Sequence, residues 1–355
     1  MNPRIVAILV VLLIILGGSA LLYQRQEAAR RPANAASLGQ VLLKDLKAAD
    51  IASIRIAEGK SVLTLARQDE RWILAELGGF PADFTKVRDF VIKAIELKAG
   101  QSEPISDKDR ARLKLDESGT TVEFRGADGK PLRSLIVGKK YFKREVENPD
   151  KAIGDGRFVQ LPSEPGVVYV VGDPLLQATA KTADWIDRSS FQIEKVKTLD
   201  VKFADAKGNY HIERSGDNAD WKLAGLKPGE KLDVSRANAA SYSLGLLDLA
   251  DAQTKEAAKD TGLDKPVEIK ATTLDGLSYD IKVGKLQGDN YFVTFSSSGT
   301  VKPDPKDAAR TKKLEERQAR DKLLQNYVLL IPKNRLEDTL KKRPEFLEKK
   351  EDRKK

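Results

Sequence analysis

The chain of 355 residues resembles itself, and this internal repeat restricts its fold more than any other feature. Residues 51–74 and 196–223 each show an alternating strand, a polar turn, a second alternating strand and a charged turn that leads to a tryptophan. These tryptophans are Trp72 and Trp221. Alternation of apolar and polar residues is typical of strands with one buried face. We therefore expect two units with the same order of elements.

A helix is predicted after each tryptophan. Asp83 and Asp233 are each placed to accept hydrogen bonds from the first backbone N–H groups of that helix. Apolar or small residues then recur at helical spacing; they are Phe84, Val87, Val91, Ala94 and Leu97 in the first copy, and Val234, Ala237, Ser241, Leu244 and Leu247 in the second. A narrow apolar face of this kind is typical of a helix that lies on a sheet.

Each copy then contains a hairpin that ends in Val-Gly-Lys and is followed by a short strand. Residues 120–139 turn at Asp128-Gly129 and residues 266–285 turn at Asp275-Gly276, where glycine supplies the positive φ of a tight turn. An apolar strand and a helix are expected to close each copy, in residues 167–188 and 327–350, and the first of these helices begins at Asp173-Pro174. Two apolar pairs share one spacing; they are Leu175 with Trp185 and Leu336 with Phe346.

The predicted fold class is α+β, with two tandem duplicated units, each a mainly antiparallel sheet covered by helices on one face. We assign residues 51–191 to the first repeat and residues 192–355 to the second, with residues 32–50 as a linker and lead-in. Two insertions break the symmetry. Residues 140–156 form an extra loop, and residues 297–326 read as a Ser/Gly/Pro linker followed by a charged helix. This added helix is either a contact for a partner or a solvated excursion.

An uncharged run of 18 residues, Ile5–Leu22, lies near the N-terminus. At about 1.5 Å per residue it spans about 27 Å, close to the thickness of a bilayer core. The run is longer than the apolar core of a signal peptide, which has about 7–15 residues. We expect residues 1–31 to be an uncleaved anchor with one transmembrane helix, although Gly18 and Ala20 would also suit a cleavage site.

Charge alone does not orient this anchor, because Arg4 precedes it and Arg25, Arg30 and Arg31 follow it. A signal-like segment at the extreme N-terminus usually sends the following chain out of the cytoplasm, and the absence of cysteine suits an oxidising compartment. We expect a single-pass protein of the inner membrane whose C-terminal part is periplasmic.

The net charge of +9 is concentrated at the two ends of the chain. Residues 302–355 carry 18 basic and 11 acidic residues, whereas the stretch between residues 31 and 302 is nearly neutral. A basic tail can contact nucleic acid, anionic lipid or an acidic partner. Residues 302–326 contain no aromatic residue, so we expect a solvated helix of mixed charge and no nucleic-acid partner.

The composition excludes several kinds of chemistry. Without cysteine the chain has no disulfide, zinc–thiolate site, iron–sulfur cluster or thiol nucleophile, and with one histidine it has no site that needs two imidazoles. Asp83 and Asp233 could be paired carboxylates of a glycosidase, but each is explained as a helix cap. His211 lies in an alternating strand and is expected at the surface. Lys139 and Lys285 lack the Ser or Thr that would follow in a P-loop.

The two tryptophans could be glycan-stacking platforms, but their recurrence at equivalent positions favours a structural role. No arrangement of Asp, Glu, Ser, Lys or Tyr in the sequence indicates a particular catalytic reaction. We therefore predict no enzyme activity, no catalytic, cofactor-binding or metal-binding residue, and no cofactor.

The order of these motifs resembles the bacterial domain of unknown function 4340 family. The features that carry the resemblance are the anchor, the Ile-x-Ile and Leu-x-Leu strands, Trp72, the Pro81-Ala82-Asp83 helix start, the Asp-Gly hairpin and Val-Gly-Lys, with Arg157-Phe158-Val159 after them. The second copy departs from this pattern with Lys231-Leu232-Asp233 and keeps only the cap. The resemblance implies a single-pass envelope protein that is associated with auxiliary components of ABC-type export systems of the gliding-motility kind, and it carries over no catalytic residue.

We therefore expect a non-enzymatic accessory or scaffold protein, anchored in the bacterial inner membrane through residues 5–22, that binds envelope proteins such as an ABC transporter permease or auxiliary subunit. The alternative is a periplasmic protein that binds or hydrolyses glycan or peptide at a site between the two repeats. The sequence does not name the partner, the ligand or the oligomeric state.

Overall fold

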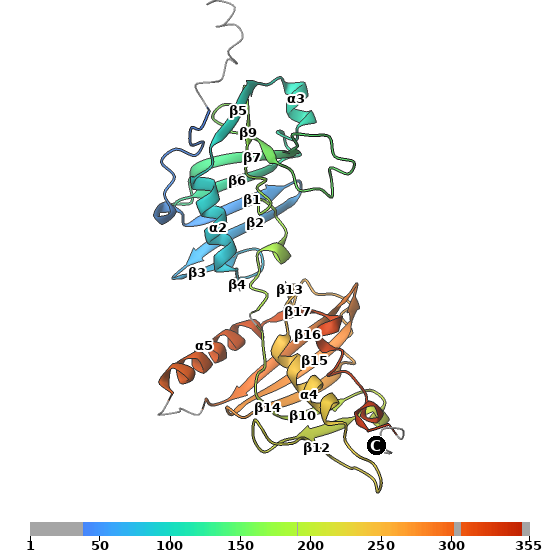
Figure 1. The fold of residues 1–355 in the computed structure, drawn as a ribbon. Helices are drawn as coiled ribbons and strands as arrows, with labels where there is room; N and C mark the ends of the chain where they lie inside the picture. The colour runs from blue at the N-terminus through green and yellow to red at the C-terminus, as the bar shows by residue number, and fades with distance from the viewer. Residues whose placement is uncertain (1–37, 190, 302–306, 350–355) are drawn as a thin grey trace, which may run out of the picture. The chain divides into compact units, whose positions relative to one another are not determined.

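The computed structural model describes residues 38–189, 191–301 and 307–349. The anchor predicted at residues 5–22 lies outside these residues. Across the described chain, none of the helices combines the length and the apolar character needed to cross a membrane. The fold consists of two antiparallel sheets with few helices, which confirms the α+β class (Figure 1).

The first sheet has nine strands in the order β4-β3-β2-β1-β6-β7-β8-β9-β5. Its strands are β1 (Ser53–Glu58), β2 (Ser61–Gln68), β3 (Arg71–Leu74), β4 (Phe80–Pro81), β5 (Ala99–Pro104), β6 (Thr120–Arg125), β7 (Pro131–Tyr141), β8 (Gly156–Gln160) and β9 (Val167–Val171). The helices in this part of the chain are α2 (Phe84–Ile95) and α3 (Asp107–Arg112), with the short 3₁₀ turns η1 (Ala48–Asp50) and η2 (Thr182–Asp184).

The second sheet has eight strands in the order β12-β11-β10-β14-β15-β16-β17-β13. Its strands are β10 (Val196–Lys202), β11 (Tyr210–Glu213), β12 (Lys222–Leu223), β13 (Asp251–Thr254), β14 (Val267–Thr273), β15 (Leu277–Gln287), β16 (Asn290–Gly299) and β17 (Tyr327–Pro332). Its helices are α4 (Val234–Ser243), α5 (Ala308–Leu324) and α6 (Lys333–Leu336), with the 3₁₀ turns η3 (Ala206–Gly208), η4 (Leu244–Leu246) and η5 (Arg343–Phe346).

The described chain divides into two compact units. The first unit contains the residues up to Thr64 together with Arg88–Ala180, and the second contains Leu65–Val87 together with the residues from Lys181 onward. Strands β3 and β4, at one edge of the first sheet, therefore belong to the second compact unit.

The two sheets have the same strand order. The run β2-β1-β6-β7-β8-β9-β5 of the first sheet has its counterpart in β11-β10-β14-β15-β16-β17-β13 of the second. Both predicted hairpins are present, because β6 pairs with β7 and β14 pairs with β15. Their turns hold Gly129 at φ 76° and Gly276 at φ 91°, as predicted for Asp-Gly.

A helix covers one face of each sheet, as predicted (Figure 1). In the first sheet, Phe90 of α2 packs against Phe124 of β6 with the ring centroids 6.0 Å apart. The opposite face of the second sheet carries polar side chains, including Lys270 and Asp280, whose charged groups lie 3.2 Å apart. Alternation along β14 and β15 thus separates an apolar face from a polar one.

The predicted helix faces are correct except at their first residues. Phe84 is 56% exposed and Val234 is 40% exposed, whereas Val87 and Ala237 are fully buried. At about 100° per residue, the buried face is centred nearer to Val87 than to Phe84, so Phe90 enters the core in place of Phe84. The same rotation applies to the second helix.

The helices predicted to close the two copies do not form as expected. The carboxylate of Asp173 accepts a hydrogen bond from Leu175 N at 2.7 Å, as in a helix cap. No helix follows, because Leu175 has a φ of 46°, which ends any helical run. After β17, only α6 and η5 form. The apolar pairs are nevertheless buried as their equal spacing indicated; they are Leu175, Trp185, Leu336 and Phe346.

The Val-Gly-Lys motif marks a close contact between a loop and a strand. In β7, Lys139 N donates to Leu113 O at 2.9 Å, and a Cβ on Gly138 would overlap that carbonyl oxygen. In β15, Lys285 N donates in the same way to Thr261 O at 2.9 Å, beside Gly284. The register of both strands shifts at this point, so each glycine lies in a bulge that admits the loop.

The loop held by this contact covers a second, smaller core on the far face of each sheet. The first contains Leu113, Leu115 and Val168 with Ile105, Ile136 and Phe158 around them. The second contains Phe292, Val328 and Leu330 with Ala250, Ala258 and Leu263. Phe158 and Phe292 occupy corresponding positions in β8 and β16.

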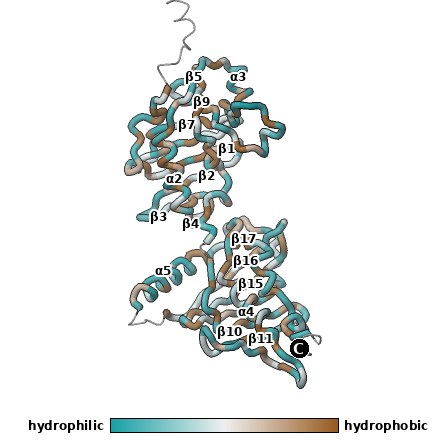
Figure 2. The backbone as a smooth tube through the Cα atoms, viewed as in Figure 1, coloured by the Kyte–Doolittle hydropathy of each residue, from teal (hydrophilic) through white to brown (hydrophobic). Residues whose placement is uncertain are grey.

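The insertion differs in part from its prediction. Residues 297–299 are the end of β16 and not a linker, whereas the charged helix is present as α5. Figure 2 shows that α5 is mainly hydrophilic, but Asp321 on its inner face is fully buried and accepts a hydrogen bond from Tyr279 Oη at 2.8 Å. One side of α5 therefore packs on its own sheet, and the helix is not only a solvated excursion.

We predict that Gly138→Ala and Gly284→Ala each lower the free energy of unfolding by about 1–3 kcal/mol, because the new methyl group overlaps a loop carbonyl that cannot move without losing its hydrogen bond. Urea unfolding of the full chain in detergent measures this loss. Gly166→Ala is the control, since it adds a Cβ with no atom within 4 Å. An equal effect at Gly166 would contradict the explanation.

We predict that Asp321 makes stability fall as pH rises. Burial raises the pKa of Asp321 above its usual 3.8, so the folded state binds the proton more tightly than the unfolded state. Its stabilisation is complete below the unfolded pKa and is lost as pH rises through the folded pKa. The unfolding free energy of the wild type minus that of Asp321→Asn should therefore decrease as pH rises above the usual pKa of 3.8. A difference that stays constant with pH would refute this.

Candidate functional site

The two aspartates considered as catalytic carboxylates are helix caps, as predicted. Asp83 Oδ1 accepts hydrogen bonds from Thr85 N at 3.0 Å and Lys86 N at 3.1 Å. Asp233 Oδ1 accepts from Ser235 N at 3.0 Å and Arg236 N at 3.3 Å.

The same two caps are also held through their backbone. Asp83 N donates to Trp185 O at 2.7 Å, and Asp233 N donates to Phe346 O at 2.8 Å. The hydrogen bond from the Ser235 hydroxyl lowers the pKa of Asp233, so this carboxylate is an anion that holds a helix and not a proton donor.

Trp221 has a structural role, as expected. Its side chain is buried, its Nε1 donates to Asn238 Oδ1 at 2.9 Å, and the guanidinium of Arg214 lies 4.8 Å from the ring centroid. A buried ring that is already stacked cannot serve as a platform for a sugar. Trp72 is half-buried in β3, and its carbonyl oxygen accepts a hydrogen bond from Ala82 N at 2.9 Å.

His211 lies in the short strand β11, with 36% of its side chain exposed. Its Nδ1 is 3.4 Å from Asp200 Oδ2 and its Nε2 is 3.9 Å from Glu213 Oε2. This is the surface position predicted from the alternating strand. Lys139 and Lys285 lie in β7 and β15, within the bulges described above. Among the described residues, no group of three or more His, Asp or Glu side chains could hold a metal ion.

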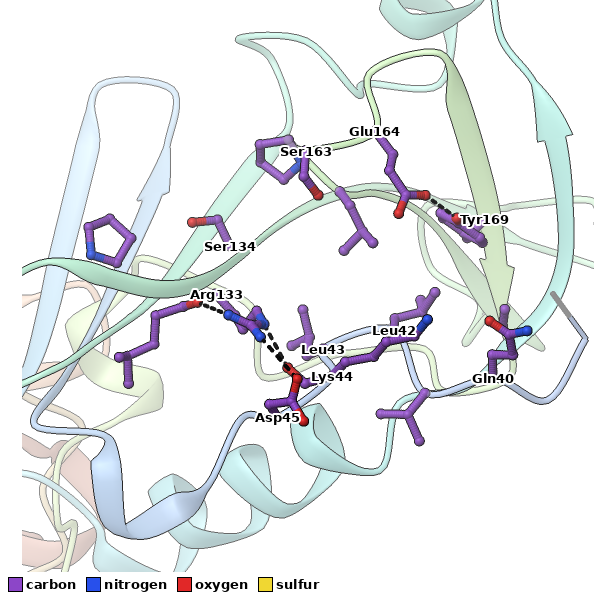
Figure 3. A pocket seen from close by; sticks show the side chains of 16 residues that line it. Gln40, Leu42, Leu43, Lys44, Asp45, Arg133, Ser134, Ser163, Glu164 and Tyr169 are labelled. Carbon is purple, nitrogen blue, oxygen red and sulfur yellow. Dashed lines mark hydrogen bonds and ion pairs between the residues drawn. The ribbon is translucent and has the colours of Figure 1, made fainter.

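The candidate functional site is a pocket of about 530 Å³ in the first unit (Figure 3). We call it the lead-in pocket. It is enclosed by three segments that lie far apart in the sequence: residues 40–45 before the first sheet, residues 131–134 at the start of β7, and residues 161–164 after β8.

The lead-in packs against the first unit. Leu42 and Leu43 are buried, and the backbone pairs with the end of α2 and the start of β5. Gly39 N donates to Ala99 O at 2.7 Å, and Ala99 N donates to Gln40 O at 3.0 Å. The described part of the predicted linker, from Leu38 onward, is therefore one wall of a pocket.

Arg133 is held by neighbouring groups of the lead-in pocket (Figure 3). Arg133 donates from Nε to Lys44 O at 2.6 Å and from Nη1 to Leu132 O at 2.6 Å, and its Nη2 lies 3.6 Å from Asp45 Oδ2.

On the other side of the pocket, Tyr169 Oη donates to Glu164 Oε2. Burial, together with the neighbouring Glu164, raises the pKa of Tyr169 to about 12, so the phenol keeps its proton at neutral pH. These groups are therefore suited to fixing the shape of the pocket and not to transferring protons.

A free strand edge runs along the lead-in pocket. β7 pairs with β8 only from Ile136 onward, so residues 131–135 have no strand on that side among the described residues. Side chains of Leu132 and Leu161 lie beside this edge. An unpaired edge next to apolar side chains can accept an extended peptide as an added strand. Sequence reasoning missed this pocket, and the signal that could have indicated it is the apolar run Val41-Leu42-Leu43 inside the predicted linker.

Comparisons with known proteins give one match. A family model described as a domain of unknown function (DUF4340) matches residues 72–266, which is more than half of the chain. No curated protein and no solved structure matches the chain.

We predict that Asp83→Ala and Asp233→Ala each cost about 1 kcal/mol of stability and that the Asn variants lose much less, because an amide oxygen can still accept the cap hydrogen bonds. Thermal unfolding of the full chain measures both. Asp264→Ala, at an exposed loop position, is the control for loss of one negative charge. If Asn were as damaging as Ala, the carboxylates would have a role other than capping.

Proposed function

Because this chain belongs to the DUF4340 family, which is named only as a domain of unknown function, we propose its function from its own geometry. The protein is a non-enzymatic accessory or scaffold protein of the bacterial envelope. Residues 5–22 anchor it in the inner membrane as a single transmembrane helix, and the rest of the chain is periplasmic.

The observation that carries this proposal is the lead-in pocket. Arg133 donates to Lys44 O and Leu132 O, and Tyr169 donates to Glu164, whereas no strand pairs with residues 131–135 on the β8 side within the described chain. Such a site offers main-chain hydrogen bonds and apolar contacts, which recognise an extended segment of another protein. The geometry therefore favours binding of a protein partner over a chemical reaction.

Two further parts of the proposal, the duplication and the kind of partner, are supported by the order of elements and by the family resemblance. The equal strand order of the two sheets supports descent from one duplicated unit, with repeats at residues 51–191 and 192–355. The resemblance supports a partner in an ABC-type export system of the gliding-motility kind, such as a permease or auxiliary subunit. The alternative, a glycan or peptide site between the two repeats, stays a prediction.

A single introduced cysteine tests the location of the chain, because the native sequence has none. Ser163→Cys places a thiol at the rim of the lead-in pocket. We expect a membrane-impermeant maleimide to label it in intact spheroplasts, and a thiol-reactive photo-crosslinker on it to recover an envelope protein.

Ser215→Cys, which is exposed in the turn after β11, is the matched control for the crosslink. It should be labelled equally by the maleimide but should recover the partner less efficiently. Labelling that requires cell lysis would refute the periplasmic location. Equal recovery of the same protein from both positions, or recovery of none from Ser163, would refute the pocket as the binding site.

A further inference from the structure

A second cavity of the first unit, of about 360 Å³, is lined by four basic side chains. We call it the basic pocket and define it by Lys114, Lys139, Lys140 and Arg157. The two acidic residues that also line it are Glu58 and Asp150, so its side chains leave an excess of two positive charges.

Three of the four cations lack a partner. Within the described residues, the side chains of Lys114, Lys139 and Arg157 make no ion pair and no hydrogen bond. Lys140 Nζ is used differently: it donates to Ala152 O at 2.7 Å and to Asp150 O at 3.1 Å, which holds the extra loop of residues 140–156 against the cavity. The pocket therefore presents cationic groups that its own loops leave unneutralised.

Arg157 is the most constrained of these cations. Its Nε is buried without a hydrogen-bond acceptor in the described chain, and burial lowers the pKa of its guanidinium. The negative charge of the Glu58 carboxylate favours the charged form of Arg157. This carboxylate makes no hydrogen bond to Arg157 and accepts one from Ala180 N. Arg157 is half-buried, and its buried Nε without an acceptor is costly; an anion within the pocket would supply that acceptor.

The strand register makes this arrangement less favourable still. Lys140 of β7 and Arg157 of β8 are directly opposite partners in the sheet. Like charges at directly opposite positions destabilise a strand pair. At the corresponding place in the second sheet, Leu286 is opposite Tyr291, an apolar pair that stabilises the same strands.

The other two cations also differ between the sheets. Lys114, which follows the loop carbonyl at the Val-Gly-Lys contact, corresponds to Gly262. Lys139 corresponds to Lys285, whose ammonium group is neutralised by Asp260. The second sheet therefore forms the same strand pairing with no unpaired cation at these four positions in the described chain. Formation of the sheet does not explain the cations of the first one.

We propose that the basic pocket binds a compact oxyanion, a phosphate group. A guanidinium group matches two phosphate oxygens at once, and lysine ammonium groups add positive charge around them. The hydroxyl group of Thr120 lines the same cavity and can donate to one of the remaining oxygens, whereas the Ser118 hydroxyl already donates to Asp116 Oδ1 at 2.6 Å. The size of the cavity admits a free phosphate ion or the head of a phosphomonoester, including that of a lipid.

Isothermal titration of the full chain in detergent with inorganic phosphate tests the site. We expect saturable binding that weakens about tenfold or more in Arg157→Gln, because a charge-assisted pair is lost. The double substitution Lys140→Leu with Arg157→Tyr, which introduces the pair found in the second sheet, should abolish binding; its melting temperature shows how much stability the lost hydrogen bonds of Lys140 to the loop had contributed. Lys285→Gln is the matched control and should leave binding unchanged.

Vesicles identify the source of the phosphate. Flotation with phosphatidic acid vesicles, and with phosphatidylcholine vesicles as the control, is measured on the chain reconstituted in nanodiscs. Binding to the phosphatidic acid vesicles alone, lost in Arg157→Gln, assigns the site to a lipid phosphate; binding of inorganic phosphate assigns it to a free ion. Absence of both, or equal binding by a folded Arg157→Gln variant, overturns the proposal. Because the lead-in pocket is untouched by these variants, the crosslink at Ser163 remains a separate test of the proposed function.

Discussion

A loop carbonyl that lies on a glycine of a long strand is the contact on which both sheets depend. Gly138 and Gly284 leave room for Leu113 O and Thr261 O, and the next backbone N–H group donates to each carbonyl. This contact allows the segment that carries the carbonyl to cover the far face of the sheet, and so gives each sheet a second apolar core. Only glycine permits so close an approach of two backbones.

Comparison of the two sheets separates the features that accompany this glycine contact from those that vary. The bulge, the capped helix and the strand order are the same in both, but the residues around the bulge are not. The first sheet has an extra loop and a group of cations there, whereas the second sheet has an apolar pair. In its turn, the second sheet carries α5, whose buried Asp321 and Arg317 replace apolar packing by polar contacts. The two sheets thus share one strand order and differ at separate places around it.

The sequence predicted the elements that depend on local patterns. Alternation gave the strands, Asp-Gly the hairpin turns, and Asp83 and Asp233 the starts of α2 and α4. Prediction from the sequence failed where a single backbone angle decided whether a helix forms. At Leu175, a positive φ ended the helix that was expected after Asp173. Sequence reasoning could not find either pocket, because their walls are joined only in space. The buried carboxylate of α5 was also missed, since a helix rich in charged residues gives no sign of which one faces inward.

The length of β7 has a consequence for how the first unit can be occupied. The strand has 11 residues, so at about 3.3 Å per residue its ends are about 35 Å apart. Residues 131–134 of the strand line the lead-in pocket and residues 137–140 line the basic pocket, so the centres of these two groups are about 20 Å apart along the strand. The continuous backbone of β7 therefore fixes the spacing between the two pockets.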